Sequence, residues 1–429
     1  MPAASELLPP LRIPRVLLDP RHSGLPGADD DGLVAVRLEH ADGLLRAIHP
    51  LQLPPDQPVP LALTPLVEPH AHLDKAFTAQ QFPNREGTLE GAMAANLLEA
   101  RERRGEDVQR RAAAALERGW RQGLRAIRSH VDGIGPWFEP SWQVLAALRR
   151  QWRGRLELQL VAMVPVSHWL TPEGRALAGR VAADGGLLGG VLGPPFAPDR
   201  RDGEALLALL QLAERHGCGI DLHVDESAAA HGRGVGLVTH LLLHHRIDVP
   251  LTCSHASSMG LKRHRPCQRL AERMAAAGVS VVALPTTNLW LLGREALRTP
   301  KQRVQAPIRQ LQSAGVCVAL GGDNVQDPWF PGGDFDPLAL MRFAMVASHV
   351  VPWQREGLSP YTTAPSQLMA LDWDGVLRVG GPADLLVLGA SDWITLQARA
   401  PQRRVLRAGR WLPPPQTETP SPLLAGLGG

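Results

Sequence analysis

Eight short apolar runs, each followed by a helix-like stretch, alternate along this chain and limit the folds that it can adopt. They are residues 65–67, 124–129, 156–164, 187–192, 219–224, 250–254, 279–284 and 316–320. The stretches between them carry apolar residues at helical spacing, as at Leu206, Leu209 and Leu210. Strands that alternate with helices build parallel sheets, and eight of them predict an α/β fold closed into a (β/α)8 TIM barrel. An open doubly wound sheet is the alternative that the count of eight disfavours.

The two ends of the chain have a β-like texture that differs from the middle. The first part is rich in proline and holds short β-like pieces at residues 33–38 and 44–48. The chain turns β-like again in VLRVGGPADLLVLGASDW and in RVLRAGRWLPP. Neither end is large enough to bury a core of its own. We therefore predict that residues 10–62 and 376–415 together form a small β-sandwich domain, and that residues 63–375 form the barrel.

Composition and charge exclude several classes of partner. The formal net charge is only +3 and the basic residues are scattered, whereas a nucleic-acid groove needs clustered Lys and Arg. No apolar run reaches the length of a membrane span, and the first residues lack the pattern of a signal peptide. The four cysteines show no CxxC spacing, which argues against disulfides and zinc knuckles. We expect a cytoplasmic protein that binds a small molecule, with neither nucleic acid nor membrane as partner; a homo-oligomer stays open.

The segment VEPHAHLDKAF, residues 67–77, holds the strongest local signal. His70 and His72 lie two residues apart at the end of the first predicted strand, where alternate side chains point to the same face. Two imidazoles at the carboxyl-terminal rim of a barrel can bind one divalent cation, with zinc and iron equally suitable. An HxH pair alone is as often structural or exposed. Its place at the functional rim favours the metal interpretation.

Polar side chains also follow other predicted strands. His223 and Glu226 come at the end of the fifth strand, His255 ends the sixth, and Asp323 ends the eighth. Each has an ordinary alternative, such as a packed core histidine at His223 or an Asx turn at Asp323. A buried aspartate is nevertheless costly unless it is paired or coordinated. Because these groups would meet at one mouth of the barrel, the set predicts a metal site more strongly than any single member.

The positions of the lysines bear on the number of metal ions. The chain has three, Lys75, Lys262 and Lys301, and none lies in predicted strands two to five. No lysine there could be carboxylated to bridge two metals, so a site with one divalent ion is favoured.

At these residues the chain resembles the amidohydrolase superfamily and, within it, the cytosine deaminase branch. The motifs that carry the resemblance are EPHAHLDK, RSHVD, DLHVDE, SHASSM, NLWLLGR and GGDNVQDPWFPGGDFDPL. The resemblance implies that the metal ligands are His70, His72, His223 and Asp323. It also implies that Glu226 is the proton shuttle and that His255 polarises the substrate.

The reaction that the resemblance implies is hydrolytic deamination of a cytosine-like, amino-substituted N-heterocycle. Metal-bound hydroxide would attack the carbon of the ring C=N bond. Glu226 would relay a proton to the ring nitrogen, Asp323 would hold the hydroxide, and His255 would stabilise the developing charge. The alternatives are an amidohydrolase acting on a cyclic amide or an N-alkylamino-triazine and, least favoured, a binding barrel without catalytic activity.

Two departures from the cytosine deaminase pattern concern the substrate. Pro165 or a neighbour stands where that branch has a glutamine that reads the pyrimidine edge, and Asn324 stands where it has an aspartate. Both changes argue against cytosine itself. We expect Asn324 to contact the substrate, together with Trp329 and Asn288, which match family positions.

Lys75 and His168 are further candidates for substrate contacts, because they could replace the groups that are missing. Each has an alternative. Lys75 could simply pair with a neighbouring carboxylate, and His168 could lie in a solvated loop.

Overall fold

The computed structural model describes residues 5–413 except residues 23, 55–56, 134 and 355. Residues 414–415 of the predicted terminal domain therefore lie outside the described residues. The chain divides into two compact units. One comprises Met1–Pro65, Arg121–Gly123 and Gly375–Gly429, and the other comprises Leu66–Trp120 and Leu124–Asp374.

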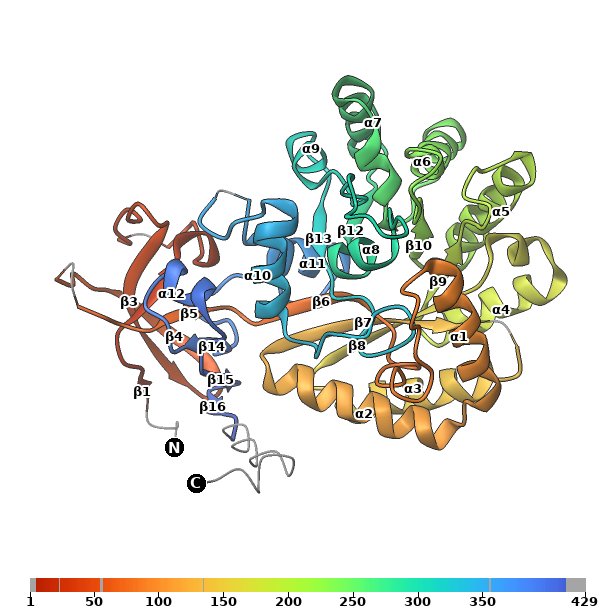
Figure 1. The fold of residues 1–429 in the computed structure, drawn as a ribbon. Coiled ribbons are helices and arrows are strands. Elements are labelled where there is room, and N and C mark those ends of the chain that lie inside the picture. Colours follow the sequence, from red (N-terminus) through yellow and green to blue (C-terminus); the bar gives the residue numbers. More distant parts are fainter. Residues whose placement is uncertain (1–4, 23, 55–56, 134, 355, 414–429) are drawn as a thin grey trace. The chain divides into compact units, whose positions relative to one another are not determined.

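The larger unit contains an eight-stranded parallel sheet, as the alternating apolar runs predict (Figure 1). Its strands pair in sequence order and are β6 (Leu66–Ala71), β7 (Leu124–Asp132), β8 (Glu157–Met163), β9 (Leu187–Val191), β10 (Ile220–Val224), β11 (Leu251–His255), β12 (Ser280–Ala283) and β13 (Val318–Leu320). The sheet closes where the amide of Asp323 donates to the carbonyl of His70 at 3.0 Å, next to a parallel bridge between Ala71 and Asp323. The predicted barrel fold is confirmed.

Helices follow the strands of this unit in the order expected for a (β/α)8 barrel. They are α1 (Leu89–Glu102), α2 (Gly105–Arg121), α3 (Phe138–Trp152), α4 (Pro172–Ala183), α5 (Arg200–His216), α6 (Arg233–His245), α7 (His264–Ala276), α8 (Pro285–Leu291), α9 (Ile308–Ser313), α10 (Pro337–Ser348) and α11 (Thr363–Leu368). Short 3-10 turns lie at η2 (Val166–Leu170), η3 (Ser257–Leu261) and η4 (Ser359–Tyr361).

The clearest local agreement between sequence and structure is at α5. Asp199 and Asp202 form a capping box at its start, which satisfies amide groups that the first turn leaves free. Gly217 ends the helix with φ of 63°, a left-handed conformation that glycine adopts without strain. This helix buries the apolar face that contains Leu206, Leu209 and Leu210.

The first strand differs from the prediction in length. The apolar run at residues 65–67 becomes a six-residue strand, β6, because it continues through a buried Glu68 and Pro69 to Ala71. Pairing with β7 shifts register between Glu68 and Ala71. His70 therefore lies within the strand, and His72 lies directly after it.

The smaller unit takes its strands from both ends of the chain, as predicted (Figure 1). They are β1 (Glu6–Leu7), β2 (Leu11–Pro14), β3 (Leu33–Ala41), β4 (Leu44–Pro50), β5 (Leu61–Leu63), β14 (Leu385–Leu388), β15 (Arg403–Arg407) and β16 (Arg410–Trp411). The two ends join where β14 pairs with β5 in an antiparallel register. The unit also holds the turn η1 (Arg15–Leu17) and helix α12 (Trp393–Ala398).

No helix in the described part of the chain is both long enough and apolar enough to cross a membrane.

Candidate active site

The carboxyl ends of the parallel strands bring the predicted metal ligands to one rim of the barrel. His70 lies in β6 with His72 beside it, His223 lies in β10, and Asp323 follows β13. His255 is the last residue of β11. All five side chains are buried, at 6% exposure or less. Residues far apart in the sequence therefore meet because strand ends meet in a closed parallel sheet.

Three imidazole nitrogens and one carboxylate oxygen converge at this rim. Nε2 of His70 and Nε2 of His72 lie 3.5 and 3.2 Å from Oδ1 of Asp323. Nε2 of His72 lies 3.5 Å from Nε2 of His223. A tetrahedral ion with ligands at about 2.1 Å holds its ligand atoms about 3.4 Å apart. His70, His72 and Asp323 offer ligand atoms that all lie within 4.8 Å of one another, and His223 adjoins this set through its contact with His72. These three separations are close to the value expected for one divalent ion.

The hydrogen-bonding state of these atoms also fits a cation. Nε2 of His70 and Oδ1 of Asp323 are buried and find no hydrogen-bond partner among the described residues. Burial lowers the pKa of His72 to about 3 and holds the pKa of His70 and of His223 well below the ordinary value. Neutral rings would direct lone pairs at a carboxylate, an arrangement that a bound cation would satisfy. Buried polar groups without any partner are otherwise rare.

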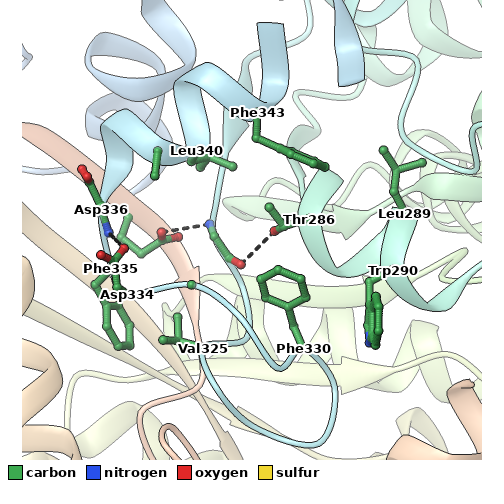
Figure 2. A pocket seen from close by; sticks show the side chains of 14 residues that line it. Thr286, Leu289, Trp290, Val325, Phe330, Asp334, Phe335, Asp336, Leu340 and Phe343 are labelled. Atoms are coloured by element: carbon green, nitrogen blue, oxygen red, sulfur yellow. Dashed lines mark hydrogen bonds between the residues drawn. The ribbon is translucent and has the colours of Figure 1, made fainter. Parts of the chain in front are cut away.

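The loop that carries Asp323 is held by Glu68 and Thr286. The carboxylate of Glu68 accepts the amide of Gly322 at 2.9 Å and that of His70 at 3.1 Å. The hydroxyl of Thr286 donates to the carbonyl of Gly322 at 3.1 Å, and dashed lines in Figure 2 mark the two bonds to this glycine. Asp323 itself has φ of 64°, a strained conformation of the kind that collects at functional sites. The sequence analysis did not single out Glu68, although a buried acid two residues before His70 was a usable signal.

Beside this loop lies an apolar cavity of about 400 Å³ (Figure 2). Its walls include Leu289 and Trp290 of α8, Phe330 and Phe335 of the loop between β13 and α10, and Phe343 of α10. Glu68 is one of its few polar groups.

His130 is a buried histidine that the sequence analysis quoted in RSHVD but did not assign. It lies in β7, and its ring stacks on the ring of His70 with centroids 3.8 Å apart. His130, His70 and His223 offer ligand atoms within 4.8 Å of one another, a second set that shares only His70 with the set of His70, His72 and Asp323. Both ring nitrogens of His130 lack hydrogen-bond partners in the described part of the chain. The available signal was strand alternation, since His130 follows a predicted strand that also ends at this rim.

A second cavity, of about 300 Å³, adjoins the candidate metal ligands. His72, His223 and Asp323 form part of its wall. The predicted residues Glu226, His255, Lys75, Asn324 and Trp329 also line it, and so does Pro165. Its apolar walls come from Leu89, Met93 and Leu97 of α1 and from Met163 and Phe196. The cavity is therefore a largely apolar space beside the histidine cluster, with a few polar groups.

Glu226 and His255 stand close together in this cavity. Oε1 of Glu226 lies 3.6 Å from Nδ1 of His255. Burial and the charge of Asp323 raise the pKa of Glu226 well above its ordinary value. A carboxyl group in this state can carry a proton near neutral pH.

Lys75 both lines the cavity and pairs with a carboxylate, so its two sequence interpretations coexist. Its Nζ donates to Oδ1 of Asp132 at 2.8 Å and lies 5.8 Å from the centre of the Trp329 ring. Arg103, at the end of α1, donates to Oδ2 of Asp132 at 2.9 Å and to Asp74 at 2.8 Å. Its guanidinium also pairs with Glu99 at 2.5 Å. This buried network fixes the place of Lys75 at the cavity wall.

Asn324 is oriented by its neighbour Asp327. Its Nδ2 donates to Oδ2 of Asp327 at 2.8 Å, and Oδ1 of Asp327 accepts the amides of Trp329 and Phe330. The indole nitrogen of Trp329 is buried and has no hydrogen-bond partner among the described residues. Trp329 therefore offers the cavity a free donor and an aromatic face.

Two predicted substrate residues lie outside the wall of this cavity. Asn288 is fully buried in α8 and bonds to His255 instead. His168 lies in η2, half-buried, with its ring 6.2 Å from that of Trp169. The sequence could not decide either case, because Asn288 was assigned from a family position and His168 as a replacement for missing contacts, and only tertiary packing decides which way they point.

Comparison with known proteins identifies a matching family and several relatives. Residues 83–411 match the family model described as the amidohydrolase family. A pterin deaminase of Rhizobium rhizogenes is 30% identical over 397 residues, covering 90% of each chain.

Solved structures show the same architecture. The 5-methylcytosine deaminase of Klebsiella pneumoniae, liganded with phosphonocytosine, has a TM-score of 0.79 and 25% identity, and the match covers 94% of this chain and 98% of that one. The N-isopropylammelide isopropylaminohydrolase of Burkholderia multivorans has a TM-score of 0.68 and 26% identity, with the same coverage of both chains.

Proposed function

Because the chain belongs to the amidohydrolase family, a family of metal-dependent enzymes that hydrolyse C–N bonds, we propose that it is a hydrolytic deaminase of an amino-substituted N-heterocycle. One observation carries the proposal. Nε2 of His70 and both carboxylate oxygens of Asp323 are buried without a hydrogen-bond partner among the described residues, next to His72 and beside a cavity that also presents Glu226.

The proposed metal ligands are His70, His72, His223 and Asp323, and one divalent ion, zinc or iron, is the proposed cofactor. When bound, such an ion lowers the pKa of water to about 7 and so makes a nucleophile available at neutral pH. Three distances between these ligand atoms, from His70 to Asp323, from His72 to Asp323 and from His72 to His223, are 3.2–3.5 Å and support this assignment.

The side chains that face the cavity supply the proton transfers. Glu226 moves a proton to the ring nitrogen next to the carbon under attack, which weakens the C=N bond. Asp323 accepts the remaining proton of the attacking water and passes it to the exocyclic amine, and His255 stabilises negative charge that develops on the attacking oxygen. The amine then leaves as ammonia or as an alkylamine. Burial at 8% exposure or less keeps bulk water from these three groups.

The cavity favours a planar heterocycle with polar edges. Trp329 offers an aromatic face, and the apolar side chains of Met93 and Phe196 suit the faces of a ring. Lys75 donates to a carbonyl or an anionic oxygen at one edge, and Asn324 bonds to the leaving amine. Pro165 supplies no amide to read a pyrimidine edge, which argues against cytosine itself.

Named relatives define the compounds to test. They are a pterin deaminase, a 5-methylcytosine deaminase and an N-isopropylammelide hydrolase. Purified protein would be analysed for bound metals and then incubated with pterins, aminopyrimidines and aminotriazines while released ammonia or alkylamine is measured. We expect one divalent ion per chain and amine release from at least one of these classes. Opening of a cyclic amide without amine release would favour the amidohydrolase alternative. A protein that binds no metal and turns over none of these compounds would contradict the proposal.

A further inference from the structure

Two histidines at the same rim have their Nδ1 atoms bonded to side chains of opposite hydrogen-bonding character. Nδ1 of His70 lies 2.8 Å from the hydroxyl of Ser254, and Nδ1 of His255 lies 2.9 Å from Nδ2 of Asn288. A neutral imidazole carries one proton, so the partner of one nitrogen decides what the other nitrogen can do.

The chain of bonds behind His70 leaves Ser254 as an acceptor. The hydroxyl of Ser254 donates its single proton to Oδ1 of Asp221 at 2.7 Å. Asp221 in turn accepts from Nη1 of Arg128 at 2.9 Å, so it faces a cation and serves as an acceptor on both oxygens. Ser254 can therefore offer His70 only a lone pair. Nδ1 of His70 then carries the proton, and its Nε2 presents a lone pair toward the candidate metal position.

Arg128 holds this chain rigidly inside the barrel. It is 2% exposed, and it also donates to the side chains of Gln159 at 3.1 Å and Thr252 at 3.2 Å. Gln159 is tied to the carbonyl of Met369 at 2.7 Å. The guanidinium cannot lose its proton, so it keeps Asp221 an acceptor.

The chain of bonds behind His255 has the opposite direction. The hydroxyl of Ser257 donates to Oδ1 of Asn288 at 2.9 Å, and the amide nitrogen of Asn288 lies 2.9 Å from Nδ1 of His255. An amide nitrogen can only donate, so Nδ1 of His255 must accept. The proton of His255 then lies on Nε2, an atom that is buried and has no partner among the described residues.

We propose that these two relays, Asp221–Ser254 and Ser257–Asn288, impose opposite tautomers on His70 and His255. The inference rests on the proposed function and explains why His70 serves as a metal ligand and His255 as a hydrogen-bond donor. His70 presents a lone pair and can bind a cation. His255 presents an N–H group and can only donate to an oxygen of the substrate or of the attacking water. Ser254, Asp221, Ser257 and Asn288 are thus positioning residues that act through the two histidines.

The test is the ¹⁵N spectrum of the histidine rings in the metal-free full-length protein, which distinguishes protonated from unprotonated ring nitrogens. Spectra of His70→Gln and His255→Gln would assign the two residues. We expect protonated Nδ1 in His70 and protonated Nε2 in His255. The same protonated nitrogen in both rings would overturn the proposal.

Two substitutions probe the relays separately. Asn288→Asp replaces the amide donor with a carboxylate that only accepts, and we expect it to move the proton of His255 to Nδ1 while His70 is unchanged. Ser254→Ala removes the acceptor from His70, and we expect it to weaken zinc affinity, measured by competition with a chelator, about 10–100-fold. Ser129→Ala is the matched control, because Ser129 is a buried serine whose hydroxyl bonds to backbone groups of Leu73 and His130.

The outcomes separate this inference from the proposed function. If the protein shows the expected tautomers but binds no zinc and releases no amine, the proposed function is contradicted and the two relays are still supported. A zinc-dependent deaminase in which Asn288→Asp leaves the His255 spectrum unchanged, or Ser254→Ala matches Ser129→Ala in zinc affinity, would contradict the relays alone.

Discussion

Two buried polar clusters of the barrel unit differ in how their members are satisfied. In the network around Arg103, the carboxylates of Asp74, Glu99 and Asp132 each lie within 2.9 Å of a guanidinium nitrogen. In the histidine cluster, Nε2 of His70 and Oδ1 of Asp323 lie buried without a hydrogen-bond partner in the described part of the chain. Both clusters exclude solvent to a similar degree.

The difference separates a structural role from a binding role. A buried charge is tolerated when opposite charges neutralise it, as in the Arg103 network. The histidine cluster lacks that internal compensation, and under the proposed function a cation from outside the chain supplies it. Changes to the first cluster should therefore affect folding, and changes to the second should affect metal and turnover.

The largest effect is expected for Glu226→Gln, which removes the proton carrier and leaves the metal ligands intact. We expect kcat to fall about 10²–10⁴-fold, or roughly 3–5 kcal/mol of activation free energy, with unchanged metal content. Steady-state kinetics and elemental analysis check both. Glu157→Gln, at the start of β8, is the control that should keep full activity. Near-normal kcat in Glu226→Gln would show that another group carries the proton.

Arg103→Met tests the other cluster, the charge network around Arg103. It removes the guanidinium from the buried carboxylate of Asp74, whereas Asp132 keeps Lys75 and Glu99 keeps Arg111. We expect the free energy of unfolding to fall by about 3–5 kcal/mol. Denaturant titration measures this. Arg110→Met is the matched control, because Arg110 pairs with Asp107 at 2.8 Å on the surface, where a pair contributes about 0–1 kcal/mol. Equal losses in the two variants would mean that the buried network does not stabilise the fold.

Removal of the metal should destabilise the protein through the histidine cluster alone. At a free zinc concentration 100 times its Kd, binding contributes about 2.7 kcal/mol to folding, which a chelator would remove. We expect a lower Tm after chelation and full recovery on adding zinc. His223→Ala, which lacks one proposed ligand, should show little or no shift with either treatment. A zinc-dependent shift of normal size in His223→Ala would exclude this residue as a ligand.

The smallest effect is expected for Lys75→Met. Lys75 belongs to the Arg103 network through Asp132, and it also lines the cavity beside the histidine cluster. Loss of one charged hydrogen bond to the substrate should lower kcat/KM about tenfold, equivalent to about 1.4 kcal/mol. Asp132 keeps its bond to Arg103, so the fold should persist. Lys262→Met is the control, since Lys262 bonds to the carbonyl of His231 at an exposed position. If the two variants have the same kcat/KM, Lys75 does not touch the substrate.

The sequence predicts the barrel correctly, and it brings the proposed ligands to one rim, because both depend on short-range order. Apolar runs mark the strands, and residues at strand ends must share a rim once the sheet closes. His130 and Glu68 were missed because their roles appear only through contacts between strands, namely a ring stacked on His70 and a carboxylate that binds Gly322.

The charge network and the cavity wall were beyond sequence reasoning for a related reason. Arg103 lies in an Arg-rich stretch that reads as a solvated helix face, yet its guanidinium is 1% exposed. Asn288 was assigned to the substrate from a family position and His168 as a replacement for missing contacts, but neither lines the cavity. Side-chain direction in loops and helix ends is fixed by packing that a single sequence does not display.

The most direct test of the account is anomalous diffraction at the zinc edge from crystals of the protein reconstituted with zinc. The account predicts one strong peak within bonding distance of Nε2 of His70, His72 and His223 and of Oδ1 of Asp323. A peak at another place, or none at full zinc loading, would contradict it.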